Sequence, residues 1–328
     1  MFFAKSILVI FISYIVSVIT GIVLIPILRK IKANQSLSIY LERTHKKKNG
    51  TPTMGGFIFI IPTLILTILL IIFNKMDLSL NLIIVIFTFI SYALIGFIDD
   101  YLIIRRHNNK GLTVNEKFFL QIIVAVVFFY LFMKAGNEPL LWIHTLGIKY
   151  NVGFIYGIII LFILVSSSNA VNISDGLDGL CGGLSLISFI TISIICYNTE
   201  WLEGYKDISL FGFILIGSIL GFLMFNTNPA KVFMGDTGSL ALGATLGSIS
   251  ILTRHEILLV IIGIVFVIET VTCILQIGYF KLTKKRLFPI TPIHHTFERY
   301  YSEVDVVHIF WLIGIIGGII GVIIAIFL

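Results

Sequence analysis

Ten long apolar runs follow one another along the chain, and short polar stretches separate them. Each run is close to the roughly 20 residues that an α-helix needs to cross the hydrocarbon core of a bilayer. The apolar positions are continuous rather than alternating, which disfavours the strands of a membrane β-barrel. The pattern therefore predicts an all-α polytopic membrane protein with about ten transmembrane helices, at residues 6–28, 55–73, 79–98, 118–134, 152–168, 180–197, 208–225, 238–252, 257–280 and 307–328.

The composition supports this prediction. Hydrophobic residues make up 58% of the 328 residues and charged residues only 12%, whereas about 25% of the residues of a soluble domain are charged. The longest polar stretches, residues 29–54 and 281–306, are too short to support a core of their own. We therefore expect one integral membrane domain over residues 1–328.

The basic residues predict how the helices are oriented. Of the 23 Lys and Arg residues, 17 lie in the loops after the first, third, fifth, seventh and ninth runs, and 6 lie on the other side. Cytoplasmic loops retain Lys and Arg, so these five loops are expected to face the cytoplasm and both termini the outside. The net charge of +6 also suits anionic lipid headgroups or a polyanionic substrate.

Two adjacent acids, Asp99 and Asp100, follow the third run. Carboxylates at the C-terminal end of a helix are unfavourable, and two neighbouring negative charges disfavour each other. We therefore expect a metal ion, the side chains of Arg105 and Arg106, or both to balance them. The alternative is a solvated helix end.

The segment after the fifth run carries four polar residues at a spacing of three: Asn169, Asn172, Asp175 and Asp178. This spacing places them on one face of a helical turn, and their oxygens suit Mg²⁺ or a nucleobase and ribose. The glycines that follow let a ligand approach the backbone closely. A helix that simply begins with Asp175 as its N-cap is the alternative, although a cap needs one such residue rather than four.

A third acid, Asp236, lies between glycines just before the eighth run. A helix N-terminus with glycine-flanked amides is a phosphate site, and an Asp beside it can hold Mg²⁺ against the phosphate. An N-cap with Ser239 in a capping turn is the alternative. Nearby Phe233 is either a stacking platform or an interfacial anchor.

His294 and His295 follow the basic residues 284–286. Neighbouring imidazoles near lysines suit phosphate oxygens or a carboxylate partner, and the spacing of further ligands does not favour zinc. Glu269, inside the ninth run, is an intramembrane acid, and such acids are functional or pair with a basic group.

All these groups share the predicted cytoplasmic side, which suits Mg²⁺-assisted phosphoryl transfer between a soluble nucleotide and a lipid phosphate. Five blocks, in this order, resemble the polyprenyl-phosphate hexosamine-1-phosphate transferases. They are GTPTMGG at 50–56, the Asp pair, NAVNISDGLDGL at 169–180, VFMGDTGSLALG at 232–243 and KKRLFPITPIHHTFE at 284–298. The first and last blocks favour the branch of this family that handles muramoyl-pentapeptide. The resemblance covers essentially the whole chain.

The resemblance implies transfer of phospho-N-acetylmuramoyl-pentapeptide from its UDP carrier to undecaprenyl phosphate in the plasma membrane of a bacterium. The products are UMP and the first lipid-linked peptidoglycan precursor. The resemblance also implies Mg²⁺ as cofactor, with Asp236 as its ligand, and Asp99 and Asp100 at the lipid phosphate. The residues that would bind the substrate are Lys48, Thr53, Asn169, Asn172, Asp175, Asp178, Asn226, Phe233, His294 and His295. No nucleic-acid partner is expected, and the oligomeric state is left open, a homodimer included.

Two positions depart from the family's pattern. Ile103 stands where the family usually has Lys, and Thr296 stands where it has a third consecutive His. These departures concern the sugar and peptide specificity more than the reaction type, so a UDP-N-acetylhexosamine transferase for another cell-wall polymer is the alternative. A transporter is a second alternative, but transport sites are expected near the bilayer midplane rather than at the cytoplasmic ends of helices.

Overall fold

The structure, a computed structural model, describes residues 2–31, 50–106, 111–143 and 147–327. Lys48, one of the predicted substrate-binding residues, lies outside the described residues. The elements, in chain order, are α1 (Phe2–Lys30), α2 (Phe57–Ile72), α3 (Leu80–Arg106), α4 (Val114–Lys134), β1 (Leu140–Ile143), β2 (Ile148–Asn151), the 3-10 turn η3 (Gly153–Ile155), α5 (Tyr156–Ile173), α6 (Leu180–Tyr197), α7 (Tyr205–Asn226), α8 (Gly235–Leu252), α9 (Leu259–Ile262), α10 (Ile264–Thr283), α11 (Ile293–Phe297) and α12 (Glu303–Phe327).

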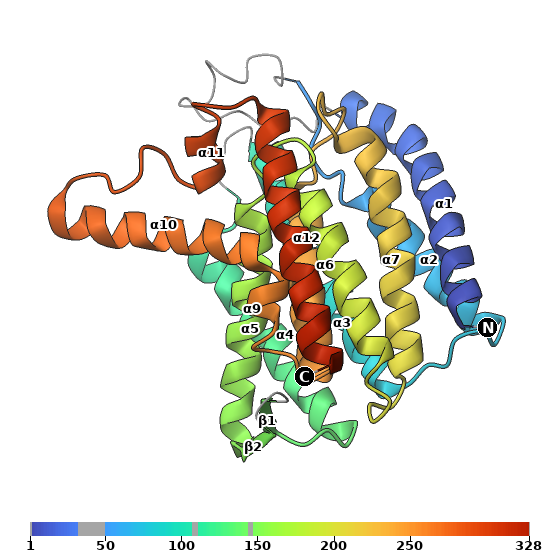
Figure 1. The fold of residues 1–328 in the computed structure, drawn as a ribbon. Helices are drawn as coiled ribbons and strands as arrows, with labels where there is room; N and C mark the ends of the chain where they lie inside the picture. Colours follow the sequence, from blue (N-terminus) through green and yellow to red (C-terminus); the bar gives the residue numbers. More distant parts are fainter. Residues whose placement is uncertain (1, 32–49, 107–110, 144–146, 328) are drawn as a thin grey trace.

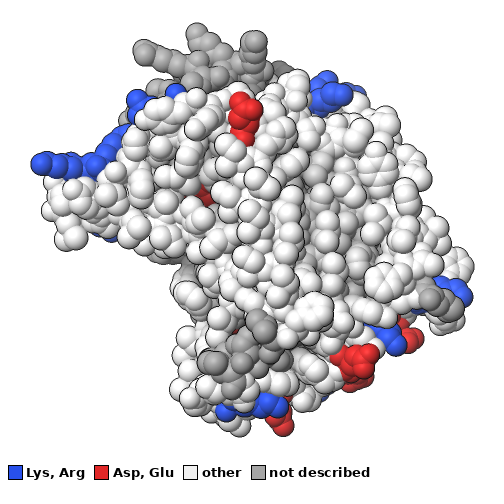
Figure 2. Space-filling model, viewed as in Figure 1, with Lys and Arg blue, Asp and Glu red and all other residues white. Residues whose placement is uncertain are grey.

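Within the described part of the chain, eight helices are long and apolar enough to cross a membrane, which confirms the coarser prediction of a helical membrane protein. The two remaining apolar runs form α2, which has only 16 residues, and α8, which is less apolar. Figure 2 shows charged side chains at the two ends of the bundle and at the outer end of α10, with a broad uncharged belt between them. Both chain termini lie at the same end of the bundle (Figure 1). The number of ten spans and the orientation in the membrane stay predictions.

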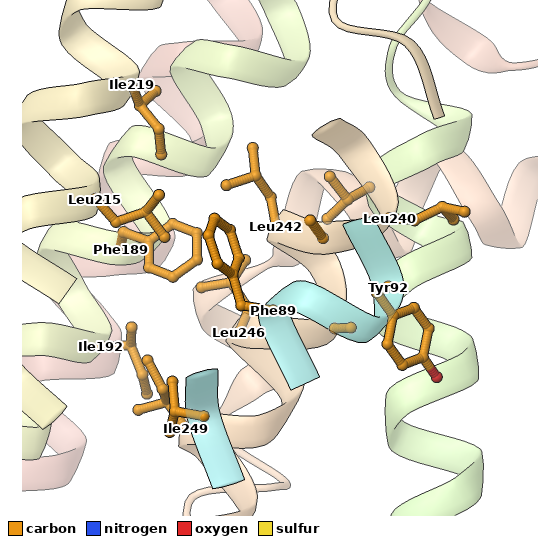
Figure 3. Close-up of a cluster of buried hydrophobic side chains, with 14 of the residues drawn as sticks. Phe89, Tyr92, Phe189, Ile192, Leu215, Ile219, Leu240, Leu242, Leu246 and Ile249 are labelled. Carbon is orange, nitrogen blue, oxygen red and sulfur yellow. The ribbon is translucent and has the colours of Figure 1, made fainter. Parts of the chain in front are cut away.

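Helix α8 forms the centre of the bundle. Every residue from Thr237 to Leu252 is buried. Small residues make this close packing possible: a Cβ on Gly243 would overlap the backbone of Ser167 in α5. Figure 3 shows apolar side chains of α3, α6, α7 and α8 in contact in this core: Phe89, Tyr92, Phe189, Ile192, Leu215, Ile219, Leu240, Leu242, Leu246 and Ile249.

The ninth apolar run does not form one straight helix. It breaks at Gly263 into the short α9 and the 20-residue α10, and α10 leaves the bundle and runs across it rather than along it (Figure 1). Only Val265, Phe266 and Glu269 of α10 are buried. Between α5, α9 and α10 lies a cavity of about 340 Å³, lined mainly by apolar side chains and also by Glu256.

The end of the bundle that holds the chain termini also carries an antiparallel hairpin, β1 and β2. The sequence analysis did not predict these strands, because each is only four residues long. Arg254 holds the hairpin by donating to the carbonyls of Glu138 and Leu140. It also donates to the hydroxyl of Tyr156, which in turn donates to Glu256. Burial raises the pKa of the Glu256 carboxyl to about 7.

Close packing of α1 against α7 gives a first prediction. A Cβ on Gly217 of α7 would overlap the carbonyl of Ile10 and the hydroxyl of Ser13 in α1. We expect Gly217→Ala to push the two helices apart and to lower the free energy of unfolding by about 1–3 kcal/mol, as overpacking usually does. The measurement is the melting temperature of the detergent-purified protein.

The matched control is Gly278→Ala in α10, because among the described residues no atom outside the local helix backbone lies within 4 Å of a Cβ at that position. This variant should melt at or slightly above the wild-type temperature, since Ala favours a helix more than Gly does. Equal melting temperatures for the two variants would contradict the close contact between α1 and α7.

Candidate active site

The three predicted catalytic aspartates come together where the last part of α3 meets the start of α8. Asp99 and Asp100 lie near the end of α3, and Asp236 lies in the first turn of α8. Gly96 makes this approach possible, because a Cβ there would overlap the backbone of Asp236. The structure thus joins two blocks that are far apart in the sequence.

Lys117 lies between two of these carboxylates. Its Nζ is 3.1 Å from Oδ1 of Asp99 and 2.7 Å from Oδ2 of Asp236. A capping box of Thr113 and Glu116 begins α4 and fixes the turn that carries this lysine. The sequence analysis counted Lys117 only among the basic residues that predict topology. The one sequence feature that points to a role in the site is the position of Lys117. It lies directly before an apolar run, in the same loop as the acidic pair.

Lys117, from the following helix, supplies a positive charge beside Asp99 of the acidic pair. Arg106 donates to the carbonyl of Gly111 at 3.1 Å, and Arg105 is exposed. Asp99 accepts a second hydrogen bond, 3.0 Å long, from the amide of Leu112. The charge balance of the pair therefore involves the helix that follows it.

Asp100 caps the N-terminus of α8 from the neighbouring helix. Its carboxylate accepts hydrogen bonds from the amides of Asp236 at 3.2 Å and Thr237 at 3.0 Å, and from the Thr237 hydroxyl at 2.6 Å. A carboxylate at a helix N-terminus satisfies amides that have no partner within the helix, and the helix dipole favours it. The sequence analysis predicted a phosphate at this N-terminus. The structure corrects this, because Asp100 already occupies these amides.

The polar residues after the fifth apolar run divide into two groups. Helix α5 contains Asn169 and Asn172 but ends before Asp175 and Asp178, so the prediction of one helical face for all four is wrong. Asn172 donates to Oδ1 of Asp236 at 2.7 Å. Asn169 donates to a carbonyl one turn back in its own helix. Asn172 therefore joins the aspartate cluster directly, and Asn169 does not.

Asp175 lies in the turn between α5 and α6, beside the aspartate cluster. Desolvation and the negative charges of Asp236 and Asp100 raise the pKa of its carboxyl to about 7, although a hydrogen bond from the Gly235 amide acts in the opposite direction. A group with such a pKa is about half protonated at neutral pH. The site therefore holds more negative charge than Lys117 alone neutralises.

Asp178 fastens the same turn to α12. Its Oδ2 accepts from the amide of Ala230 at 2.9 Å and from Nδ2 of Asn228 at 3.3 Å. Glu303, in the first turn of α12, accepts from the amide of Asp178 at 2.8 Å and from Asn228 at 3.0 Å. Glu303 was not among the predicted site residues, because nothing in the sequence brings the start of the last helix to this turn.

Asn226 connects the start of α6 with the segment before α8. Its Oδ1 accepts from the amide of Gly179 at 3.1 Å, and its Nδ2 donates to the carbonyl of Val232 at 3.0 Å. The side chain is buried. The structure thus gives this predicted substrate residue a place in the framework of the site, and its contact with a substrate stays a prediction.

The GTPTMGG block lies along the segment that precedes α8. The amide of Phe233 donates to the carbonyl of Pro52, and the amide of Gly55 donates to the carbonyl of Phe233, both at 2.8 Å. The ring of Phe233 is partly exposed. Thr53 is buried, and its hydroxyl has no hydrogen-bond partner among the described residues. The pairing therefore brings together the aromatic ring of Phe233 and the unsatisfied hydroxyl of Thr53.

The two predicted histidines lie in α11, and both are buried. Nδ1 of His294 is 3.1 Å from Oε2 of Glu269, and Nδ1 of His295 is 2.6 Å from Oε2 of Glu298. Each histidine therefore has a carboxylate of its own. For Glu269 the neighbour is thus His294, at ion-pair distance but without hydrogen-bond geometry, and the role of this acid stays open.

The carboxylates fit Mg²⁺, although no three His, Cys, Asp or Glu side chains in the described ranges form a cluster of metal ligands. Mg²⁺ usually takes one or two carboxylates, while phosphate and water oxygens complete its octahedron. Asp99 and Asp236, which both reach the ammonium group of Lys117, provide such a pair.

Known proteins resemble this chain over most of its length. Residues 82–254 match the model of glycosyl transferase family 4. The chain is 46% identical over 314 residues to the phospho-N-acetylmuramoyl-pentapeptide-transferase of Staphylococcus saprophyticus, covering 94% of this chain and 96% of that protein. It is 42% identical over 317 residues to the proteins of the same name from Geobacillus sp. and Bacillus subtilis, covering 96% of each chain.

The cap on α8 separates the roles of the two adjacent acids. We expect Asp100→Ala to lower the free energy of unfolding by about 1–2 kcal/mol, because the first amides of a buried helix lose their acceptor. Asp99→Ala is the matched control. It should destabilise the protein less, since its partner Lys117 keeps the carboxylate of Asp236. The measurement is thermal unfolding in detergent, and equal losses in the two variants would count against the cap.

Proposed function

The chain belongs to the family of the phospho-N-acetylmuramoyl-pentapeptide transferases, within glycosyl transferase family 4, and we propose that it transfers phospho-N-acetylmuramoyl-pentapeptide from UDP to undecaprenyl phosphate. It is a multi-pass transferase of the bacterial plasma membrane. The products would be UMP and the first lipid-linked peptidoglycan precursor.

The observation that carries this proposal is the position of Asp99, Asp236 and Lys117 at one end of an apolar bundle. Groups at this depth can meet a water-soluble nucleotide from one side and a lipid phosphate from the other. Their composition suits this task, since carboxylates paired with an ammonium group lie where two anionic substrates must meet. A transport site would be expected near the middle of the bundle instead, so the transporter alternative loses its support.

The apolar cavity between α5, α9 and α10 supports the choice of a lipid acceptor. It has a volume of about 340 Å³, and Phe162, Leu259, Phe266 and Ile274 are among its lining residues. Val171, near the end of α5 and close in sequence to Asn172, also lines it. A polyprenyl chain could therefore enter along α10 while its phosphate reaches the aspartates.

In the proposed reaction, an oxygen of the lipid phosphate attacks the β-phosphorus of the nucleotide sugar. The bond from this phosphorus to the bridging oxygen breaks, and UMP leaves with that oxygen. A phosphate monoester with a second pKa of about 6 is mostly a dianion at neutral pH, so the attack needs no strong base. The main task of the protein is to position two anions in line and to reduce their repulsion.

Asp236 would hold Mg²⁺, and Asp99 would complete a carboxylate pair beside the lipid phosphate. When bound, Mg²⁺ supplies charge neutralisation at the diphosphate. Lys117 keeps both carboxylates oriented toward one point, and Asn172 fixes Oδ1 of Asp236 from α5. Asp175 and Asp178, on the turn that follows, would line the side where the nucleotide sugar binds.

The alternative substrate is UDP-N-acetylhexosamine, and the departures at Ile103 and Thr296 are the reason to keep it. The hydroxyl of Thr296 donates to the carbonyl of Ile290 at 2.6 Å and accepts from its amide at 3.3 Å. Thr296, which replaces the third histidine, therefore stabilises the loop that begins at Ile290 and provides no imidazole for a substrate. A change in sugar or peptide preference would follow from this loss.

Release of UMP tests the proposal. Detergent-purified protein would be given Mg²⁺ and UDP-N-acetylmuramoyl-pentapeptide, with and without undecaprenyl phosphate. Release that requires the lipid supports direct transfer, whereas release without the lipid indicates a covalent enzyme intermediate. UMP release only with UDP-N-acetylglucosamine as the donor would favour the alternative substrate. No UMP release with either donor would overturn the proposed sugar-phosphate transfer.

Within this assay, we expect Asp236→Asn to abolish UMP release and Asp99→Asn to lower its rate, because both remove a negative charge beside the diphosphate. The loss for Asp236→Asn should exceed about 100-fold, as expected when a main electrostatic contact of the transition state is removed. Asp305→Asn in α12 is the control. This acid is exposed and bonded to Ser302, so the variant should keep the wild-type rate. A near-normal rate of UMP release for Asp236→Asn would contradict the role proposed for Asp236.

A further inference from the structure

Glu269 lies in the interior of α10, and the proposed reaction gives it no role. Its side chain and that of His294 are both fully buried, with 0% exposed, and Oε2 of the glutamate lies 3.1 Å from Nδ1 of the histidine. A carboxylate at this depth is costly unless a basic or hydrogen-bonding group compensates it. The pair therefore joins α10 to α11 through a contact that excludes water.

The opposite edge of the His294 ring lies against the turn between α5 and α6. A Cβ on Gly176 would overlap Nε2 of His294 and would lie 2.9 Å from its Cε1. Gly176 directly follows Asp175 and comes two residues before Asp178. The ring therefore fills the space between the buried carboxylate and the backbone of this turn, and only a glycine leaves room for it.

The two nitrogens of the ring face different partners. The carboxylate beside Nδ1 restricts the orientation of the ring through close contact at ion-pair distance, without the geometry of a hydrogen bond. Nε2 is then directed at the Gly176 turn. The neighbouring His295 ring, 4.2 Å away between centroids, does not share this carboxylate, because its own Nδ1 lies beside Glu298. The orientation of His294 therefore depends on Glu269.

We propose that Glu269 is a positioning residue for the nucleotide side of the active site. It holds the ring of His294, and the ring holds the turn that carries Asp175 and Asp178. This inference rests on the proposed function, because that function assigns the turn to the UDP-linked substrate. Asp99 and Lys117, on the proposed lipid-phosphate side, belong to α3 and α4 and make no contact with this pair in the hydrogen bonds described above. Loss of Glu269 should therefore affect one substrate and spare the other.

The test is the steady-state rate of UMP release, with each substrate varied in turn. Glu269→Leu places an apolar side chain of similar size in the buried position and removes the carboxylate beside Nδ1. We expect the KM for UDP-N-acetylmuramoyl-pentapeptide to rise about tenfold, a typical effect of removing a carboxylate that orients a functional histidine. The KM for undecaprenyl phosphate should stay at the wild-type value.

Two further variants separate positioning from general damage. Glu269→Gln retains a polar side chain of the same shape beside Nδ1 and should recover most of the loss. Ile268→Ala changes the adjacent residue of α10, which is 37% exposed, and should leave both KM values unchanged. A variant that only destabilises the protein would lower the apparent kcat and leave both KM values alone, and this result for Glu269→Leu would overturn the proposal.

A double-mutant cycle tests whether Glu269 acts through His294. Glu269→Leu combined with His294→Ala should raise the KM for the nucleotide substrate no further than His294→Ala alone, because groups that act as one unit are not additive. Independent, additive effects would overturn the proposal. If the wild type releases no UMP from this donor, the proposed function fails by itself, and the same cycle is then read from melting temperatures. Additive shifts in that measurement would overturn the pairing as well.

Discussion

A helix that begins inside a protein needs acceptors for the amides of its first turn, and in this chain Asp100 supplies them to α8. The side chain of Asp100 is only 4% exposed, so these hydrogen bonds are also what compensates its own charge. Removal of the Asp100 carboxylate would leave the first amides of α8 without acceptors, and removal of these amides would leave a buried charge without donors. This mutual dependence fixes α3 against α8, and the positions of Asp99, Asp236 and Lys117 follow from it.

Much of the architecture could be predicted from the sequence, because the membrane imposes a simple rule on apolar length. The runs became helices, and the blocks around Asp99 and Asp236 came together at one end of the bundle. The prediction that these blocks share one side of the membrane needed only two facts. Successive loops lie on alternate sides, and one set of loops holds most of the Lys and Arg residues. The chemistry of that end could be inferred before any distance was known.

The two missed residues of the site, Lys117 and Glu303, depend on contacts between distant segments. Lys117 looked like a topological charge, since nothing local indicates that the first turn of α4 faces two aspartates. Glu303 is 125 residues from Asp178, and no periodicity connects them. The end of α5 before Asp175 was missed because polar residues at a spacing of three are compatible with both a helix and a turn. The break at Gly263 was missed because the apolar run continues through it. The short β-hairpin had no pattern long enough to be recognised.

The low apolarity of α8 also has a consequence for how the protein is made. A helix that is 18 residues long and rich in Gly, Ser and Thr gains little by entering lipid alone. The helices that pack most closely against it, α3, α5 and α6, all precede it in the chain. During synthesis, α8 therefore emerges after its neighbours and can insert into a protein surface rather than into lipid. The order of the helices along the chain thus matches the order in which they would fill the interior of the bundle.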